Sequence, residues 1–578
     1  MLTDEQKVKI EENKRQALLR RERARVSLAS APSNESFSSS IHKDRIRKLN
    51  ENASDGTKTY VLYWMQSSHR ATNNEALEFA VERANIFQKP LIVAFALTCE
   101  YPDANERHFR FMLSGLIDVR TGLSERNIPF LLVVKNKGVD KVSHTDAIVD
   151  LAKNAVEVVT DCGYLRILRK WREDVANAIS IAMTEIETDV VVPVFAHLRA
   201  RPNLDTSAAS FRSWCLPKSY EHTNNYPDLV PIKEKWTTSD AELARVCAIE
   251  CCCTNSGGNF SFVMDGNIVL NGNNEKNSNN KVNIINVNDL LFHLKANHGL
   301  KETPNIPPNC DAYHVGGELE ALRKFRTFLD PTTVLKNYGE HRNDCARGLQ
   351  SHLAPYIHYG QISVLHIAKR SRKLASMHKE DEKIQKSIDV FLDELIIRRE
   401  LGIQLVVKKK DTYDTYEALP TWAINSLEKH KEERTTKYSY EDLANSKTDD
   451  PLWNAAQNEL RITGKMHNYT RMFWGKKVVE WHKCSKTAFA VLMKLNDTYS
   501  LDGRDPNSFT GVGWIFGLND KPFPEAPVMG EVRRMSINGC KKRFGKSIEA
   551  YIERWNGNAN KGGRQSTLSS MFLKKQKT

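Results

Sequence analysis

Short apolar runs alternate with helix-period segments along the first two hundred residues. Segments such as 74–87 and 106–123 repeat apolar residues every three or four positions, the spacing of one helix face. The runs around these segments are rich in β-branched residues and lie at residues 60–65, 90–97, 129–134, 156–160 and 189–194. Strands alternating with helices predict a doubly wound parallel sheet, and nearly continuous apolar runs indicate strands covered on both faces.

The pattern changes after about residue 200, where the strand signal fades. Residues 247–310 begin with a cysteine cluster and continue with many Asn and Gly residues, which favours an inserted loop or linker. From residue 317 onward, apolar stripes of helical period follow one another at residues 318–329, 362–375, 383–401, 451–464, 469–483 and 485–495. The chain is therefore predicted to have an α/β domain followed by a large all-helical domain.

These changes divide the 578 residues into five parts. We expect a disordered basic tail at 1–56, an α/β domain at 57–205, a linker with an Asn-rich insert at 206–316, a helical domain at 317–548 and a flexible basic tail at 549–578. A length prior of about 150 residues per domain gives two to four domains, in keeping with this division.

Basic charge is concentrated at the two ends of the chain. The formal net charge is +13, and residues 1–48 hold 12 Lys and Arg against 7 Asp and Glu. Residues 541–578 hold 10 against 2, so the body between the two ends is neutral overall. Basic ends favour nucleic-acid contact or nuclear targeting, although a merely solvated tail explains the N-terminal one equally well. We expect a nuclear location.

Membrane insertion and secretion are not expected. No run of 18 apolar residues occurs, and the charged N-terminus lacks the apolar segment of a secretory signal. Eleven cysteines, an odd number, favour a reducing compartment over a disulfide framework. The residue types of a zinc site are present at Cys247, Cys251, Cys252 and Cys253, but no second ligand pair follows at finger-like spacing, so we predict no metal site.

Residues 450–545 are unusually dense in Trp, Asn, Arg, Asp and Gly. Trp474 and Trp481 are seven residues apart, which on a helix is two turns along one face, and Trp453 lies on the preceding predicted helix. Such a row consists of core aromatics or, beside a redox cofactor, of carriers for electron hopping. Spacing alone leaves both interpretations open.

Two polar segments are candidates for binding a ligand. Residues 501–509 carry Asp502, Arg504, Asp505 and Asn507 among turn formers, which suits either a surface turn or a loop that faces a heteroaromatic ring. Residues 351–363 open a helix with hydroxyl and backbone donors, which suits either a capped helix or a diphosphate site. The chain lacks the P-loop, HExxH, GxSxG and strand-linked GxGxxG motifs, which argues against the common enzymes that use them.

Several long segments resemble the class II cyclobutane pyrimidine dimer photolyases, a branch of the photolyase and cryptochrome family. The resemblance is carried by residues 63–77, 338–361, 391–401, 452–481, 495–514 and 527–544, in the family's order. It implies an enzyme that binds FAD in its helical domain and repairs UV-damaged DNA. Electron transfer from the photoexcited reduced flavin splits the flipped-out dimer. It also implies an antenna chromophore in the α/β domain, either 8-hydroxy-5-deazaflavin or methenyltetrahydrofolate.

The resemblance also implies roles for individual residues. Glu394 would hydrogen-bond the dimer base, Asn496 would face the flavin N5/O4 edge, and Arg471 would pair with Asp502 beside the flavin ring. The remaining cofactor contacts would be Tyr338, Ser351, Leu353, Tyr356 and Asp505. The other lesion contacts would be Arg342, Arg398, Met472 and Trp514. Electrons would reach the flavin through Trp481, Trp453 and Trp474, with Trp474 nearest to it.

The sequence departs from the family pattern near the expected dimer pocket. Residues 402–405 read GIQL where the family usually has an Ala-Asp-Asn-Phe type of segment. Val512 and Gly513 stand where it tends to have Cys-Met, which removes bulk beside the dimer.

A second motif lies in the C-terminal tail. Gln565, Leu568, Met571 and Phe572 form Q-x-x-L-x-x-M-F, followed by three lysines. This resembles the peptide with which repair proteins bind the sliding clamp PCNA, although Met571 replaces the more usual aromatic residue.

Three functions are compatible with these features. The preferred prediction is a lyase that acts as a monomer and repairs pyrimidine dimers in DNA. The alternatives are a cryptochrome-like flavin photoreceptor without repair activity and a non-catalytic scaffold that binds damaged DNA or the clamp.

Overall fold

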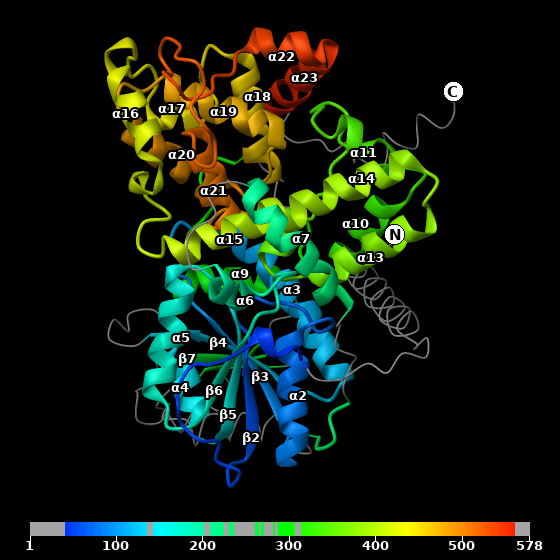
Figure 1. The fold of residues 1–578 in the computed structure, drawn as a ribbon. Helices are drawn as coiled ribbons and strands as arrows, with labels where there is room; N and C mark the ends of the chain where they lie inside the picture. Colours follow the sequence, from blue (N-terminus) through cyan, green and yellow to red (C-terminus); the bar gives the residue numbers. More distant parts are fainter. Residues whose placement is uncertain are drawn as a thin grey trace, which may run out of the picture.

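The computed structural model describes residues 41–135, 143–201, 208–224, 231–235, 260–264, 267–270, 281–283, 287–306 and 314–560. An α/β domain, lower in Figure 1, carries a larger helical domain above it. The predicted fold class is confirmed. No helix in these ranges is both long and apolar enough to cross a membrane.

Five parallel strands form the centre of the sheet, in the order β6-β5-β2-β3-β4. They are β2 (Tyr60–Trp64), β3 (Leu91–Leu97), β4 (Phe130–Lys135), β5 (Ala155–Asp161) and β6 (Met183–Ile186). Side chains along β2 alternate between two apolar clusters, as the two-residue period of a strand requires. Val61 and Tyr63 pack with α2 (Glu75–Phe87) and α3 (Glu106–Glu125). Leu62 and Trp64 pack on the other face, with α4 (Asp146–Ala152) and α5 (Arg166–Ala178).

The strand predicted at residues 189–194 is wrong. The structure places β6 earlier, and the apolar run lies in the loop before α6 (Val194–Ala200). Val190, Val191 and Val192 are buried because the two domains meet there, not because they belong to the sheet. The backbone N–H groups of Val191 and Val192 donate to the Glu400 carboxylate, whereas those of a strand would bond to a neighbouring strand.

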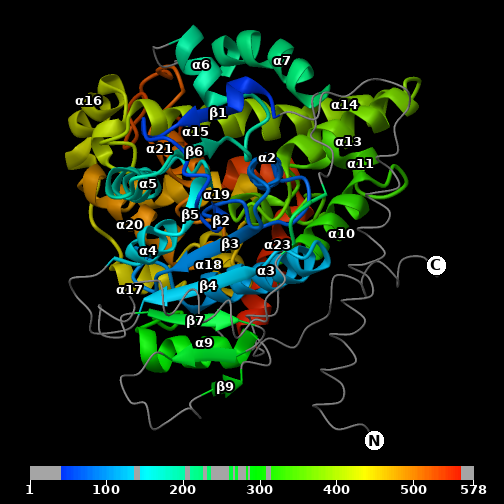
Figure 2. The same cartoon turned by 90° about the horizontal axis from the view of Figure 1, so that it is seen from below.

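Antiparallel strands extend both edges of this sheet. At one edge β1 (Ile46–Lys48) pairs with β6, and at the other β4 is followed by β7 (Phe260–Met264), β8 (Asn267–Leu270) and β9 (Lys281–Asn283). Figure 2 shows the two extensions at opposite ends of the sheet. They fall in the segments expected to be a tail and a linker, and their short or polar strands give little periodic signal.

The boundary expected at residue 56 is corrected by Arg45, which is 2% exposed. Its guanidinium donates to the backbone oxygens of Glu187, Val190 and Val191 at 2.8–3.0 Å. Residues 41–56 therefore belong to the α/β domain. Within its described residues, the linker segment also contains the helices α7 (Ala208–Asn224) and α9 (Val287–His298).

The helical domain follows the predicted stripes with two differences. Its helices are α10 (Glu318–Leu329), α11 (Leu335–His341), α12 (Ala354–His358), α13 (Val364–Met377), α14 (Glu382–Leu392), α15 (Arg399–Lys408), α16 (Thr421–Lys429), α17 (Tyr440–Ala444), α18 (Pro451–Thr463), α19 (Asn468–Glu480), α20 (Ser485–Tyr499), α21 (Pro506–Ile515), α22 (Ile537–Phe544) and α23 (Lys546–Asn560). The helix expected over 383–401 is interrupted by a π-helical turn, Asp393–Arg398. Where a tail was expected from residue 549, the structure has helix α23 as far as Asn560. This helix contacts α18, and its residues Tyr551 and Trp555 are buried.

Buried charges join the two domains. The guanidinium of Arg107, on α3, donates to the backbone oxygens of Leu460 and Tyr499 at 3.2 and 3.1 Å. Burial raises the pKa of the Glu400 carboxyl, on α15, to about 7, and its oxygens accept the two valine N–H groups described above. These contacts fix the ends of α15, α18 and α20 relative to the sheet.

Candidate functional site

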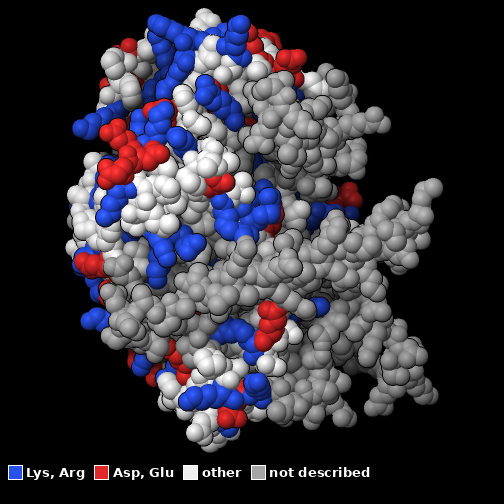
Figure 3. Space-filling model, turned by 90° about the vertical axis from the view of Figure 1, so that its right-hand side faces the viewer, with Lys and Arg blue, Asp and Glu red and all other residues white. Residues whose placement is uncertain are grey.

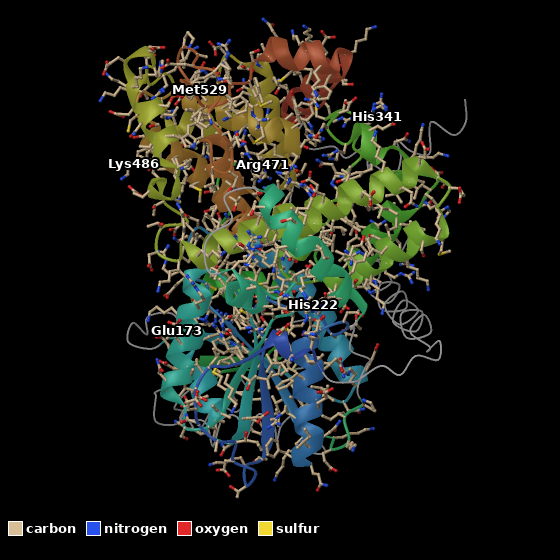
Figure 4. All side chains as sticks on the ribbon, in the orientation of Figure 1. Glu173, His222, His341, Arg471, Lys486 and Met529 are labelled. Atoms are coloured by element: carbon tan, nitrogen blue, oxygen red, sulfur yellow. The ribbon has the colours of Figure 1, made fainter. Side chains whose placement is uncertain are left out.

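A cavity of about 310 Å³ lies inside the helical domain, among α11, α19, α21 and the π-helical turn. Its volume is at the lower end of the range of roughly 300–1,000 Å³ for ligand sites. Eleven of the predicted site residues line it: Tyr338, Arg342, Ser351, Leu353, Glu394, Arg398, Arg471, Trp474, Asn496, Asp502 and Asp505. Figure 4 labels Arg471, which lies within the helical domain above α15. Residues from six separate segments thus converge on one site.

The π-helical turn places Glu394 and Arg398 at the cavity. A π turn shifts the helical register locally and occurs often at functional sites. Glu394 Oε1 lies 3.4 Å from Arg342 Nη2, and the two side chains are 38% and 29% exposed. A charged pair that retains contact with water can exchange its partners for those of an incoming ligand.

Arg471, Asn496 and Asp502 form a connected polar cluster. Arg471 Nη1 donates to Asn496 Oδ1 at 3.1 Å, and its Nη2 lies 3.8 Å from Asp502 Oδ1. The expected Arg471–Asp502 pair is therefore present. Ser500 Oγ donates to the same carboxylate at 2.6 Å, and Asn496 Nδ2 donates to Asp497 at 3.0 Å. This network fixes the amide of Asn496, whose second N–H has no partner in the described part of the chain.

Asp505 is held by a histidine that sequence reasoning missed. His358 Nδ1 donates to Asp505 Oδ2 at 3.1 Å, and the other carboxylate oxygen accepts from the backbone and side chain of Asn507. Burial opposes the charge of Asp505, but the His358 hydrogen bond and the Arg399 charge outweigh it and lower its pKa to about 2. Asp505 is therefore an anion at neutral pH. Because 147 residues separate this pair, no local signal revealed it.

Two basic groups beside the cavity were also missed. Lys465 lines it directly, and burial lowers the pKa of its amine to about 8. His352 is next to the lining residues Ser351 and Leu353, and its buried Nδ1 has no hydrogen-bond partner. Burial holds the pKa of His352 well below its usual value. Both groups are poised to interact with a negatively charged ligand.

The three predicted tryptophans form a continuous row from this cavity. Trp474 is part of the cavity wall and stacks on Trp453, with ring centroids 6.4 Å apart and 13° between the planes. Trp453 meets Trp481 at 5.5 Å. The indole N–H of Trp453 donates to the Trp474 backbone oxygen, and that of Trp474 donates to Gln457, each at 2.9 Å. The order agrees with the predicted one, and Trp481 is slightly more exposed (7%) than Trp453 (0%) and Trp474 (1%).

Three of the predicted cofactor and lesion contacts do not line the cavity. The Tyr356 hydroxyl donates to the Val315 backbone oxygen at 2.7 Å inside the core, and Met472 packs partly buried against the neighbouring core. Trp514 lies at the edge of the site, where the Arg398 guanidinium is 5.4 Å from its ring centroid. Its indole N–H donates to Asp520 at 2.8 Å, a contact that sequence reasoning missed.

Packing accounts for the glycine in each of the two departures, Gly402 and Gly513. A Cβ at Gly402 would lie only 3.0 Å from Thr510 Oγ1, so glycine permits the close approach of α15 to α21. Beside Gly513, Leu518 fills the space, because a Cβ there would lie 2.7 Å from Leu518 Cδ2. Leu518 therefore occupies the space beside Gly513, although it is not among the residues that line the cavity.

Other predictions fall on residues outside the described ranges. Among them are the expected N-terminal tail as far as residue 40, most of the Asn-rich insert, the cysteine cluster at 247–253 and the clamp-like residues Gln565, Leu568, Met571 and Phe572. Figure 3 shows Lys and Arg side chains at the top of the helical domain, the end where α22 lies. That helix carries Lys541, Lys542 and Arg543, all exposed.

Comparison with known proteins gives consistent similarities. Residues 61–219 match the DNA photolyase family. The chain is 36% identical to the deoxyribodipyrimidine photo-lyase of Methanothermobacter thermautotrophicus over 519 residues, which cover 89% of this chain and 99% of that protein. It is 32% identical to the Arabidopsis thaliana protein of the same name, covering 89% and 92%.

Solved structures share the fold at lower identity. A class III photolyase from Agrobacterium tumefaciens superposes with a TM-score of 0.60 at 16% identity, covering 88% of both chains. A Synechocystis cryptochrome gives 0.57 at 13% identity, covering 86% of this chain and 88% of that one.

Proposed function

The chain belongs to the DNA photolyase family, and on this basis we propose that it is a deoxyribodipyrimidine photo-lyase that repairs cyclobutane pyrimidine dimers. The observation that carries the proposal is the helical-domain cavity, where the residues expected to contact cofactor and lesion converge. The row of stacked tryptophans that begins at its wall adds support.

The lining residues fit FAD. Leu353, Leu395, Val512 and Ile515 provide apolar walls for a flat ring, and a Cβ built at Gly511, also in the lining, would meet no atom within 4 Å. Lys465 and the Nδ1 of His352 match a diphosphate, which would favour their protonated forms. When bound and reduced, FAD would supply on illumination the electron that splits the dimer.

The polar cluster orients the ring. Arg471, restrained by Asp502 and Asn496, presents a fixed positive charge beside the cavity, while Asn496 offers its remaining N–H. The anionic Asp505 and its partner His358 supply a second fixed polar edge. These groups are ordered by the protein before the ligand binds, which reduces the free-energy cost of orienting it.

Arg342, Glu394 and Arg398 act on the substrate side. The flipped-out dimer would displace the exposed Arg342–Glu394 contact, so that Arg342 binds a lesion phosphate and Glu394 a base edge. Trp514, held by Asp520 and covered by Arg398, offers a stacking surface at the edge of the site. Trp481, Trp453 and Trp474 would carry electrons inward to keep the cofactor reduced.

Finer assignments are proposed from the sequence motifs. The segments at 452–481 and 495–514 support class II membership, and Q-x-x-L-x-x-M-F at 565–572 supports binding to the sliding clamp. The basic ends of the chain support a nuclear location. The α/β domain is proposed to hold an antenna, 8-hydroxy-5-deazaflavin or methenyltetrahydrofolate, and the enzyme to act as a monomer.

The test is repair of an oligonucleotide with one thymine dimer by the reduced holoenzyme under blue light, with a dark control. We expect thymine absorbance to return only in the light. Glu394→Gln should lower the yield per absorbed photon roughly tenfold or more, because the carboxyl contact to the dimer is altered. Bound flavin that photoreduces while the dimer survives illumination would contradict repair and indicate a photoreceptor.

A further inference from the structure

A second cavity, of about 890 Å³, lies at the outer end of the tryptophan row. It is enclosed by α19, α22 and the loop around residues 527–536, and Trp481 forms part of its wall. Met529, labelled near the top of Figure 4, also lines it. Thus one end of the row faces the proposed cofactor site and the other faces a separate, solvent-connected cavity.

The charges around this cavity favour an anion. Its two acidic residues are already paired: Glu433 with His430 at 2.7 Å and the Val528 N–H at 2.7 Å, and Glu480 with Lys477 at 2.6 Å. Its two arginines have no carboxylate partner among the described residues. Arg534 is exposed and makes no ion pair or hydrogen bond there. Arg543 lies over the Tyr469 ring at 5.3 Å.

The remaining wall suits a flat ring. Trp481 and Tyr469 present aromatic surfaces, and Met529 and Met535 contribute polarisable sulfur, which contacts aromatic rings favourably. The volume falls within the range of small-molecule sites, about 300–1,000 Å³. A small aromatic ligand with a carboxylate or phosphate satisfies both the charge and the shape.

We propose that this cavity binds a small anionic aromatic reductant that returns an electron to oxidised Trp481. The inference rests on the proposed function, because the row becomes oxidised only when Trp474 donates inward. The step is a one-electron transfer: the donor is oxidised to its radical, and the Trp481 radical cation is reduced to neutral tryptophan. Since Trp481 contacts Trp453 at 5.5 Å, filling the hole there prevents the electron from returning along the row.

The test uses two related donors, 2,5-dihydroxybenzoate, which is an anion, and 1,4-dihydroxybenzene, which is neutral. A light flash oxidises the row in the holoenzyme, and the decay of the tryptophan radical is followed against donor concentration. We expect the rate to saturate with the anion. Arg534→Gln should raise the half-saturating concentration roughly tenfold, the loss expected for one charge-assisted contact, while rates with the neutral donor stay unchanged.

Arg370→Gln is the matched control, because it removes the same charge from an exposed position on α13. It should leave the saturation curve unchanged. The inference would be overturned if the rate of radical decay rose linearly with donor concentration, or if the two substitutions had equal effects. Either result would indicate that the donor reacts by diffusional collision, influenced only by the net charge of the protein.

Equilibrium dialysis in the dark gives a readout that does not depend on photochemistry. The oxidised holoenzyme should bind one 2,5-dihydroxybenzoate per chain, and Arg534→Gln should weaken this binding whereas Arg370→Gln should not. Repair by the dithionite-reduced wild type separates the two proposals. If the protein repairs dimers but binds no donor saturably, only the inference is overturned. If it repairs no dimers, the proposed function is contradicted.

Discussion

The junction between the domains and the cavity in the helical domain both bury charges, but they do so in opposite ways. At the junction Arg45 is saturated by backbone oxygens of its own domain, and Arg107 and Glu400 are saturated by backbone groups of the neighbouring domain. At the cavity the Lys465 amine, the Nδ1 of His352 and one N–H of Asn496 have no hydrogen-bond partner among the described residues. Because an unsatisfied buried polar group costs free energy, the first arrangement indicates structure and the second indicates a ligand.

The largest expected effect comes from breaking the junction. Glu400→Ala removes the acceptor of two buried N–H groups and leaves a cavity, so it should destabilise the protein by about 3 kcal/mol. The measurement is the urea midpoint of the holoenzyme. Glu400→Gln, which keeps an acceptor oxygen, is the control and should retain most of the stability. If both variants unfold alike, the backbone contacts are not what stabilises the junction.

Removing a charge from the cavity should affect binding more than folding. Asp502→Asn weakens the restraint on Arg471, and we expect about tenfold weaker flavin binding with less than about 1 kcal/mol lost from the free energy of unfolding. Titration of the flavin-free protein with FAD measures the affinity. Asp174→Asn, at the exposed Lys170 pair on α5, is the matched control. A large loss of stability with unchanged affinity would assign Asp502 to the structure instead.

The smallest expected effect is an increase in the free energy of unfolding, whereas the two substitutions above lower it. Burial lowers the pKa of Lys465 from 10.5 to about 8, so the fold disfavours its charge. This cost is present below about pH 8 and disappears as the pH rises from 8 to 10.5. Lys465→Met should therefore stabilise the flavin-free protein by about 1 kcal/mol at pH 7 while weakening flavin binding. Thermal unfolding at pH 7 and 10 checks this, and destabilisation at both would show that the amine has a structural partner.

The sequence predicted the elements whose signal is local. The strands near residues 60–65, 90–97, 129–134 and 156–160 and the helices around Trp453 and Trp474 are present because each pattern reflects burial by its own element. The run at 189–194 was misassigned because its valines are buried by another domain. A buried segment has the same composition whether its N–H groups bond to a strand or to a carboxylate.

The site was predicted where motifs are contiguous and missed where it depends on distant contacts. Asp502, Asn496 and Arg471 lie in segments whose resemblance is strong, and the structure brings them together. His358, Lys465 and Gln457 carry no individual signal, because their importance depends on Asp505, the cavity and Trp474 respectively. Tyr356 lies in the correct segment but faces the core, since a motif gives the position of a residue and not its orientation.

The π-helical turn at Asp393–Arg398 sets the rotational register between the cavity and the domain junction. A π turn is equivalent to one extra residue within an α-helix. Deleting a single residue there would merge α14 and α15 into one regular rod and rotate everything on one side of the deletion by about 100° around its axis. Glu394 and Glu400 would then no longer face the cavity and the junction together. The π-helical turn thus lets one continuous helical segment present Glu394 to the cavity and Glu400 to the junction.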